Sequence, residues 1–398
     1  MPAPIKQHLI DPEICIRCYT CENTCPIEAI EHNDDNVVVD VTKCNYCMEC
    51  IPVCPTGSID EWRVVATPFT LEDQYEWEEL PDQDDIELPE DSGDTSMEAL
   101  DDAIAALLAE AHKGAGGKAK APASASKPTI NLFNLDNPTT AVVQGNFELT
   151  KGSPENDVRH IILDFGGTNF PLLEGQSIGI IPPGMGTDGK PHLPRLYSVS
   201  SPRDGERPNY NNVSLTVARE DGGVASNYLC DIEQGAQVKV TGPFGSTFLM
   251  PNDANAKLLM ICTGTGSAPF RAFTMHRQRS SPDTNGTMTL VFGARRPDAL
   301  PYFGPLRKVP DSFLRKHLVF SRSDDAPKRY VQDELIEEGE MVAGLLTDAK
   351  THIYICGLKA METGVDAAFR NICESAGMEW EPLRDTMRDD GRYHVETY

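Results

Sequence analysis

Apolar and polar positions alternate over short distances in the middle of the chain. From about residue 130 onward, strand-like runs such as residues 213–218 (VSLTVA) and 238–241 (VKVT) are separated by segments rich in glycine and proline. Short alternating runs with frequent turn residues are typical of an antiparallel sheet. We therefore predict an antiparallel β-barrel over residues 130–252.

Beyond residue 253 the pattern changes to apolar runs that alternate with segments of helical periodicity. These runs cover residues 257–262, 288–292, 317–320 and 352–356. Strands that alternate with helices predict a parallel sheet with crossover helices on its faces. Residues 253–398 should therefore form an α/β domain, different in class from the barrel before it.

Cysteines, rather than apolar periodicity, mark the N-terminal region. Eight of the twelve cysteines lie in the first 54 residues, where residues 11–31 are repeated as residues 40–60. They form two copies of one pattern, Cys15, Cys18, Cys21, Cys25 and Cys44, Cys47, Cys50, Cys54. This is the bacterial ferredoxin spacing for two [4Fe–4S] clusters, in which three thiolates wrap one cluster and the fourth reaches the other. The expected ligand sets are therefore crossed, namely Cys15, Cys18, Cys21 with Cys54, and Cys44, Cys47, Cys50 with Cys25.

Zinc binding and disulfides are the alternatives for so many cysteines. Paired CxxC motifs are common in zinc sites, and an even cysteine count occurs in secreted disulfide-bonded proteins. A zinc site, however, has no use for the third cysteine at i+6 or for Pro26 and Pro55 after the fourth. We therefore predict an α+β dicluster ferredoxin domain over residues 1–68.

The overall composition narrows the class of protein. The formal net charge is −26, which argues against a nucleic-acid partner because phosphates require a basic surface. No stretch approaches the ~18 consecutive apolar residues of a membrane span, and the N-terminus has no signal-peptide core. A hydrophobic content of 40% is sufficient for two or three domain cores. We expect a cytoplasmic protein with no membrane contact.

Residues 69–129 have the composition of a linker. Residues 72–102 carry fifteen carboxylates, and no lysine or arginine occurs between residues 64 and 112. A solvated, self-repelling linker is the favoured interpretation, and a docking surface for a basic partner is the alternative. Within it, residues 96–111 predict a short amphipathic helix, and residues 112–128 a flexible tether.

Two motifs of the barrel region resemble the flavin site of the plant-type ferredoxin–NADP⁺ reductase superfamily. They are RLYS at residues 195–198 and GGVASNYL at residues 222–229, followed by GPFG at residues 242–245, which resembles the turn that closes the family's barrel. Ser226 is a candidate N-cap for a helix there. The resemblance implies a FAD-binding domain whose cofactor contacts are Arg195, Tyr197, Ser198, Thr216, Ala218, Gly223, Val224, Ala225 and Ser226.

The α/β region carries the corresponding nucleotide motifs. TGTGSAPFR at residues 263–271 follows the first strand and opens a helix, where free N–H groups and the helix dipole suit a pyrophosphate. Three cations, Arg322, Lys328 and Arg329, are grouped with a hydroxyl after the predicted strand at residues 317–320. These cations suit the dianionic 2′-phosphate that distinguishes NADPH from NADH, so NADPH is favoured. A solvated basic loop is the alternative for these cations. The resemblance implies nucleotide contacts at Thr263, Thr265, Gly266, Ser321, Arg322, Lys328, Tyr330 and Gln332.

The same family resemblance implies a hydride-transfer site. CGLKAM at residues 356–361 matches the family's CGxxxM segment, and the sequence ends in an aromatic residue, as in those reductases. Tyr398 is expected to cover the flavin as a displaceable lid. The implied catalytic residues are Ser198, Cys356, Glu396 and Tyr398.

The order of the parts resembles one narrower family, component A of the benzoyl-CoA oxygenase (benzoyl-CoA 2,3-epoxidase) system. This implies electron flow from NADPH through FAD and two [4Fe–4S] clusters to a separate di-iron oxygenase, in aerobic benzoate degradation. The alternatives are a ferredoxin-dependent NADP⁺ reductase that works in the opposite direction and a non-catalytic assembly subunit. A self-sufficient oxygenase is disfavoured, because no ExxH ligand set accompanies these motifs. The oligomeric state stays open, with a homodimer among the alternatives.

Overall fold

A computed structural model of the chain describes residues 5–44, 50–51, 53–54, 56, 58–59, 63–65, 67–81, 120–150, 157–186, 189–208, 210–322 and 328–397. The chain divides into two compact units, Met1–Thr95 and Ser96–Tyr398, and each is considered by itself. The predictions for Cys47, for Tyr398 and for a helix at residues 96–111 fall outside the described residues. Among the described residues, no helix has the length and apolar character that crossing a membrane requires.

The first unit is a small α+β domain with an internal twofold relation. β1 (Ile5–Gln7) pairs with β4 (Arg63–Val65), and β2 (Ile30–His32) pairs with β3 (Val37–Val39), both antiparallel. α1 (Thr20–Thr24) contains Cys21 and lies between Cys18 and Cys25. The backbone N–H of Asp11 donates to the carbonyl of Ser58 at 2.7 Å, and that of Asp40 donates to the carbonyl of Ala29 at 2.8 Å. Asp11 is equivalent to Asp40 in the sequence repeat, and Ala29 is equivalent to Ser58. Each half therefore donates the same backbone hydrogen bond to the other half.

The first unit extends past residue 68, the predicted start of the linker. Thr70 caps the short helix α2 (Leu71–Tyr75), with Asp73 completing a capping box. The buried Gln74 amide donates to the carbonyl of Val39 at 3.0 Å, and the Asn36 amide donates to the carbonyl of Trp77 at 2.8 Å. These side-chain bonds tie α2 to β3, so the acidic start of the predicted linker belongs to the first unit.

In the second unit, six antiparallel strands form a barrel-like sheet in the order β8-β7-β10-β5-β6-β9. An isolated bridge between Val199 and Leu215 joins its two ends. Inward-facing apolar side chains such as Ile161, Ile178 and Leu215 are fully buried in its core. The strands are β5 (Thr139–Glu148), β6 (Val158–Asp164), β7 (Ser177–Ile181), β8 (Arg195–Ser198), β9 (Asn212–Ala218) and β10 (Gln237–Phe244).

One predicted turn of this domain is wrong. Residues 242–245, expected to close the barrel, lie mainly within β10, where the pairing with β7 shifts register between Thr241 and Phe244. Gly242 also pairs with Phe133. The family resemblance of residues 242–245 implied a turn, but an irregular strand end also accommodates consecutive Gly and Pro.

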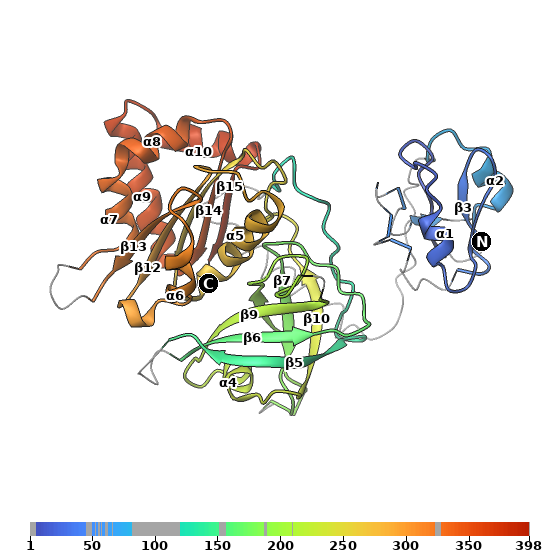
Figure 1. Cartoon of the computed structure of the whole chain (residues 1–398), viewed down its shortest axis with the longest axis horizontal. Coiled ribbons are helices and arrows are strands. Elements are labelled where there is room, and N and C mark those ends of the chain that lie inside the picture. Colours follow the sequence, from blue (N-terminus) through green and yellow to red (C-terminus); the bar gives the residue numbers. More distant parts are fainter. Residues whose placement is uncertain are drawn as a thin grey trace. The chain divides into compact units, whose positions relative to one another are not determined.

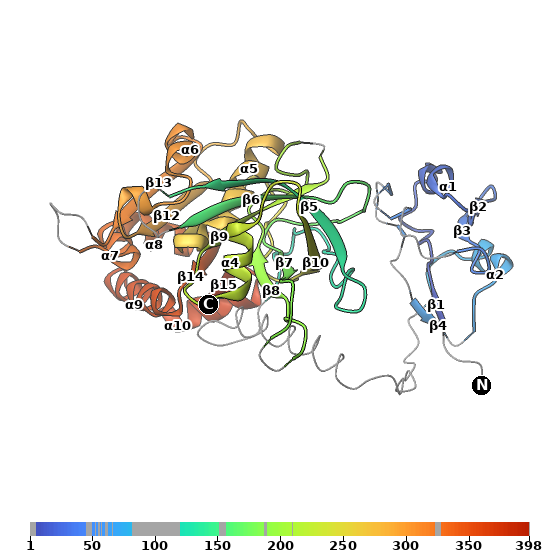
Figure 2. The same cartoon turned by 90° about the horizontal axis from the view of Figure 1, so that it is seen from below.

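The remainder of the second unit is a five-stranded parallel sheet in the order β13-β12-β11-β14-β15, so the prediction of an antiparallel domain followed by an α/β domain is confirmed. Helices α7, α8, α9 and α10 cover one face and α5 covers the other (Figures 1 and 2). The strands are β11 (Lys257–Thr263), β12 (Met288–Ala294), β13 (Leu314–Phe320), β14 (Thr351–Gly357) and β15 (Tyr393–Thr397). The helices are α5 (Ala268–Ser280), α6 (Phe303–Lys308), α7 (Val331–Glu337), α8 (Gly339–Thr347), α9 (Lys359–Ser375) and α10 (Trp380–Asp389).

Residue alternation along β11 explains how the sheet carries two cores. Leu259 and Ile261 face the core shared with α7 to α10, whereas Leu258, Met260 and Cys262 face the core shared with α5. The chain order reverses between β11 and β14. In open α/β sheets such a switch point, at the carboxyl ends of the strands, is where ligands bind.

Residues 120–129 pack on the second unit, although the sequence assigned them to the linker. Lys120 Nζ donates to the carbonyl of Asp389 at 2.9 Å, and Ser126 Oγ accepts from Arg203 at 3.0 Å and from Asn252 at 2.9 Å. These are single polar contacts with no apolar periodicity, which is why the sequence pattern gave no sign of them.

Buried ion pairs lock the barrel to α5. Glu174, with no exposed surface, lies 2.7 Å from Arg203 and 3.1 Å from His276 of α5. Burial of the Glu174 carboxyl works to raise its pKa, but the hydrogen bonds and charges of His276 and Arg203 outweigh it and lower the pKa to about 2. Arg271 of α5 likewise pairs with Glu206 at 2.7 Å, and the hydrogen bonds of His160 and Arg271 hold the pKa of that carboxyl well below its usual range against burial.

Glu174→Gln should destabilise the second unit in a pH-dependent way. A carboxyl whose folded pKa is depressed contributes stability that is present above its unfolded pKa and disappears as the pH falls toward the folded value, here from about 4.5 to about 2. The variant should lose about 2–4 kcal/mol of unfolding free energy near pH 7 and vary less across that acid window. Urea unfolding followed by circular dichroism measures both.

Asp298→Asn is the matched control, since Asp298 forms an exposed pair with Arg296 at 3.4 Å. It should leave the unfolding free energy nearly unchanged. Parallel pH profiles for the wild type and Glu174→Gln would show that the Glu174 pair does not stabilise the domain junction.

Candidate active site

The barrel and the parallel sheet meet at a pair of side chains from distant parts of the chain. Ser198, the last residue of β8, donates from Oγ to Glu396 Oε1 at 2.5 Å. Glu396 lies on β15, beside Cys356 of β14 in the parallel register. Glu396 is 7% exposed and Cys356 is fully buried. Three of the four predicted catalytic residues therefore lie together, and the fourth, Tyr398, is outside the described residues.

The Cys356 thiol is held in its neutral form. Burial raises its pKa well above the usual range, and the Glu396 carboxylate and the neighbouring Cys262 thiol raise it further. A protonated, buried thiol is a poor nucleophile. Cys356 can shape a site and exclude water from it, but it is not poised for covalent chemistry.

The ends of β11 and β14 approach each other closely beside Thr263. Thr263 Oγ1 is buried and has no hydrogen-bond partner among the residues that the structure describes. The 3₁₀ turn Gly264–Ser267 follows β11 and leads into α5, as predicted for residues 263–271. Gly357, at φ +142°, brings the end of β14 close to Thr263. A buried hydroxyl without a partner at the switch point fits a polar ligand such as a nicotinamide nucleotide.

Gly266→Ala should disrupt this corner. A Cβ atom on Gly266 would lie 2.2 Å from the carbonyl oxygen of Cys356 and 3.0 Å from the Cα of Gly357, both backbone atoms that cannot rotate away. Separating the η2 turn (Gly264–Ser267) from β14 should lower the unfolding free energy by about 1–3 kcal/mol and weaken nucleotide binding about tenfold or more. Thermal unfolding and a nucleotide titration monitor the two effects.

Gly344→Ala in α8 is the control, because nothing lies within 4 Å of its added Cβ. It should be neutral or slightly stabilising, since alanine favours helices. Nucleotide binding by Gly266→Ala at the wild-type level would contradict the close approach of η2 to β14.

The predicted flavin motifs frame one end of the barrel. Arg195 is exposed at the start of β8, and Tyr197 is half-buried, with burial raising the pKa of its phenol. α4 (Val224–Asp231) begins at Gly223, which is its N-cap, so the prediction of Ser226 as N-cap is wrong. The buried Ser226 hydroxyl instead lies within the first turn, where it donates to the carbonyl of Gly223 at 3.3 Å and accepts from the N–H of Glu220 at 3.2 Å.

Thr216 has a structural contact that its predicted role did not include. Its hydroxyl lies 2.6 Å from the hydroxyl of Tyr302, which is also 3.0 Å from His160 Nδ1. Tyr302 precedes α6, so Thr216 and His160 join the barrel to the α/β domain. Among the other predicted flavin contacts, Val224 is half exposed, Ala225 is buried and Ala218 ends β9.

The basic segment after β13 divides into two kinds of cation. Arg322 and Lys328 are exposed, and neither makes an ion pair with any described residue. Arg329, in contrast, is paired with Glu334 at 2.6 Å and with Glu337. Of these three cations, only Arg329 is therefore neutralised by carboxylates of the described residues. Ser321 is held beside them by a backbone bond to Ala294 at 3.0 Å.

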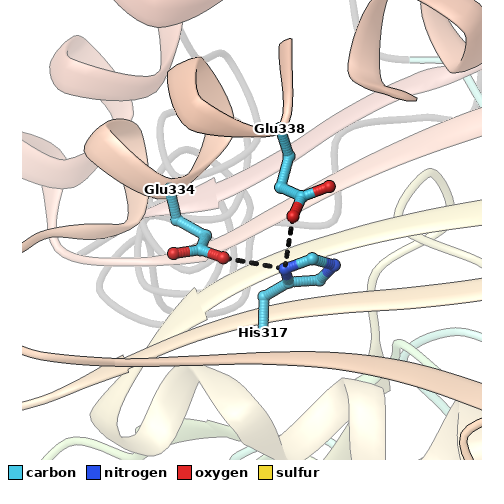
Figure 3. A group of neighbouring side chains, drawn as sticks. All are labelled: His317, Glu334 and Glu338. Atoms are coloured by element: carbon cyan, nitrogen blue, oxygen red, sulfur yellow. Dashed lines mark hydrogen bonds and ion pairs between the residues drawn. The ribbon is translucent and has the colours of Figure 1, made fainter. Parts of the chain in front are cut away.

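Glu334 belongs to a network that fixes α7 to the edge strand β13 (Figure 3). His317 of β13 points its Nδ1 at Glu334 at 2.8 Å and lies 4.0 Å from Glu338. The three side chains have the donor types of a metal site. Each carboxylate is also paired with an arginine, Glu334 with Arg329 and Glu338 with Arg315 at 3.6 Å, so the group is sufficiently explained as an ion-pair network.

Tyr330 and Gln332 lie at the start of α7, next to this network. Tyr330 is the N-cap, is 47% exposed, and has its backbone N–H bonded to Asp333 at 2.8 Å. The Gln332 amide packs against Gly364 of α9. Tyr330 is therefore exposed, and its role as a residue that stacks on a ring stays a prediction.

Six of the seven described cysteines of the first unit belong to one core, namely Cys15, Cys21, Cys25, Cys44, Cys50 and Cys54, and the seventh, Cys18, is exposed. Burial, together with the neighbouring Cys15 and Cys54 thiols, raises the pKa of Cys21 to about 11. The hydrogen bond from Thr20 lowers the pKa of Cys18, and the nearby Cys54 thiol works to raise it. Cys54 thus lies with the first three cysteines, as the crossed ligand sets require.

Three hydroxyl residues near these thiols escaped the sequence analysis. Thr20 Oγ1 donates to Cys18 Sγ at 3.4 Å, and Cys54 Sγ lies 3.2 Å from Ser58 Oγ and 3.7 Å from Thr56 Oγ1. Burial works to raise the pKa of Cys54, but Ser58 and Thr56 outweigh it and lower the pKa to about 7. A lowered thiol pKa suits a thiolate ligand. The sequence repeat could have pointed to two of them, because Thr56 and Ser58 stand where the first copy has Ile27 and Ala29.

Comparisons with known proteins agree with both units. Residues 7–55 match the 4Fe-4S dicluster domain family, and residues 260–367 match the oxidoreductase NAD-binding domain family. The chain is 37% identical to ferredoxin–NADP reductase of Thermosynechococcus vestitus over 325 residues, 76% of this chain and 84% of that protein. It is 38% identical to ferredoxin–NADP reductase of Spirulina sp. over 288 residues, 68% of this chain and 98% of that protein.

Among solved structures, ferredoxin–NADP⁺ reductase from Plasmodium falciparum aligns with a TM-score of 0.54 and 26% identity, over 68% of this chain and 99% of that one. The chain therefore belongs to the ferredoxin–NADP reductase family as an NAD(P)-dependent flavin oxidoreductase, and it joins that module to a dicluster domain that implies two [4Fe–4S] clusters.

Proposed function

We propose that the chain is the reductase component of a two-component monooxygenase. Electrons would enter from NADPH, pass through FAD and the two clusters, and leave to a separate di-iron oxygenase. The observation that carries this proposal is the presence, in one chain, of a dicluster domain and a ferredoxin–NADP reductase module. A reductase that carries its own one-electron carriers is suited to a dedicated acceptor.

The site residues have defined tasks in this scheme. When bound, the flavin takes two electrons together as hydride and gives them up singly, one for each cluster. The Ser198 hydroxyl donates a hydrogen bond to Glu396, and this bond fixes its orientation. The Ser198 oxygen can then accept a hydrogen bond from a ligand. The buried, neutral Cys356 and the close approach at Gly266 exclude water from the nucleotide end.

NADPH is the proposed nucleotide, because Arg322 and Lys328 are exposed cations suited to a 2′-phosphate. Arg322→Ala combined with Lys328→Ala should raise the KM for NADPH about 100-fold or more, since each of the two charge-assisted bonds contributes about 1.5–3 kcal/mol. The KM for NADH should change little. Lys308→Ala, an exposed lysine at the end of α6, is the control for loss of a positive charge elsewhere on the surface. An equal rise in both KM values would mean that the two cations do not read the phosphate.

We further propose benzoyl-CoA 2,3-epoxidation as the reaction served, in aerobic benzoate degradation. Support comes from the order of the parts along the chain, which resembles component A of that system. The test is NADPH consumption by the full chain with a candidate oxygenase. Consumption should rise on addition of benzoyl-CoA and yield the epoxide. Consumption that ignores benzoyl-CoA, with oxygenase activity toward another substrate, would assign the reductase elsewhere.

The opposite direction is the second candidate, because the relatives are named ferredoxin–NADP reductases. In that case reduced clusters would supply electrons for NADPH formation. Rates measured both ways on the same preparation distinguish them. The reductase proposal requires NADPH oxidation with an acceptor to be faster than NADP⁺ reduction by chemically reduced clusters.

A further inference from the structure

The two halves of the first unit place different side chains around equivalent ligands. Ser58 and Ala29 occupy the same position, because their carbonyls accept the matching bonds from Asp11 at 2.7 Å and Asp40 at 2.8 Å. The sequence repeat gives the same equivalence for Thr56 and Ile27. Any difference between these paired positions is therefore a difference between the surroundings of Cys54 and those of Cys25.

Cys54 receives hydroxyl donors that Cys25 does not. Ser58 Oγ lies 3.2 Å and Thr56 Oγ1 3.7 Å from Cys54 Sγ. Cys25 Sγ accepts the backbone N–H of Ala29 at 3.2 Å, and neither Ile27 nor Ala29 has a hydroxyl to add.

A third hydroxyl acts on the same group of ligands. Thr20 Oγ1 donates to Cys18 Sγ at 3.4 Å. The residue equivalent to Thr20 in the second half is Glu49, which lies outside the described residues and, when ionised, has no proton to donate. Cys18 and Cys54 belong to one crossed ligand set, so all three hydroxyls serve the cluster of Cys15, Cys18, Cys21 and Cys54.

Hydrogen bonds to ligand sulfur change the reduction potential of a cluster. One-electron reduction makes the cluster more negative, and a donor to a negative acceptor forms a stronger bond. Donors therefore stabilise the reduced form more than the oxidised form and raise the potential.

We propose that the two clusters are unequal, and that the one held by Cys15, Cys18, Cys21 and Cys54 has the higher potential because of Thr20, Thr56 and Ser58. This inference rests on the crossed ligand sets and deepens the proposed electron path. NADPH and two oxidised clusters give NADP⁺, a proton and two reduced clusters. The first electron reduces the higher-potential cluster of Cys15, Cys18, Cys21 and Cys54. The second electron reduces the cluster of Cys44, Cys47, Cys50 and Cys25.

The test is a potentiometric titration of the full chain with its clusters, followed by electron paramagnetic resonance. The wild type should show two separate potentials. Thr56→Val combined with Ser58→Ala should lower the higher potential and leave the other in place. The reciprocal variant, Ile27→Thr with Ala29→Ser, introduces hydroxyls at the equivalent positions and should raise the lower potential. Both changes should bring the two values together.

Thr20→Val is an independent check from the other half of the sequence, and it should lower the same potential as the Thr56 and Ser58 changes. Iron content shows that each variant retains both clusters. If both clusters are present and the Thr56 and Ser58 changes move the lower potential or neither, the inference is overturned. Wild-type protein that binds no clusters would instead overturn the proposed function.

Discussion

Ser198→Ala is expected to slow reduction of the bound flavin by NADPH about 100-fold, the usual range for a positioned proton-handling group. Ser198 and Glu396 come from different domains yet form a 2.5 Å hydrogen bond at the junction. Glu396→Gln keeps the shape and removes the charge, and it should slow the reaction to a similar extent. Single-turnover stopped-flow absorbance of the flavin, under anaerobic conditions, measures the rate directly.

The double variant tests whether the pair acts as a unit. If each side chain works only through the other, removing both should cost no more than removing one. Thr397→Val is the matched control on the next residue, because the Thr397 hydroxyl bonds to Glu362 at 3.0 Å and not to Ser198. It should lower stability without changing the rate. Independent, multiplying effects of the two site changes would contradict the paired role.

Loss of clusters in paired cysteine variants has the second large effect. Under crossed ligation, Cys18→Ala with Cys54→Ala removes ligands from one cluster only, so iron should fall from about eight to about four atoms per chain. Cys18→Ala with Cys25→Ala removes a ligand from each cluster, and both should be lost. Uncrossed ligation predicts the reverse, so iron analysis of these two variants separates the alternatives.

These variants also separate the two units. The predicted flavin contacts all lie in Ser96–Tyr398, so NADPH oxidation with ferricyanide, which can take electrons from a flavin, should survive in both variants. Reduction of any acceptor that depends on the clusters should be lost in the second variant. Loss of the ferricyanide activity as well would mean that the two units do not function separately.

Much of the fold was predictable because apolar runs fix the strands. β11, β12 and β14 were expected from runs of buried aliphatic residues, and each strand differs from its prediction by at most two residues at either end. β13 begins three residues earlier than expected, at Leu314, because Arg315 and Lys316 interrupt its apolar pattern. Periodicity detects side chains that are buried in a regular alternation, and it misses polar residues at a strand start.

The ends of the units were not predictable in this way. Gln74 and Asn36 attach α2 through bonds from side chain to backbone, and Ser126 attaches the chain before β5 through single polar contacts. The same limit applies to Glu174 and Glu206. An isolated acidic residue in a sequence carries no sign that folding will place a basic residue of α5 beside it, His276 for Glu174 and Arg271 for Glu206.

The site itself was predictable as motifs and not as a geometry. Residues 195–198 and residues 263–271 carry recognisable patterns, but the bond from Ser198 to Glu396 depends on how two domains meet. The structure also pairs Arg329 with Glu334 and Glu337, whereas Arg322 and Lys328 make no ion pair within the described part of the chain. The number of cations can be read from the sequence, but only the side-chain geometry shows which of them are paired with carboxylates.

Anaerobic addition of NADPH to the full chain with its cofactors tests the central claim most directly. The account predicts that the flavin absorbance bleaches first and that cluster absorbance then falls, with electron paramagnetic resonance signals of reduced [4Fe–4S] clusters. The variant Cys18→Ala with Cys25→Ala should show the flavin change without those signals. Flavin reduction in the wild type with clusters that stay oxidised would contradict an electron path from NADPH to the dicluster domain.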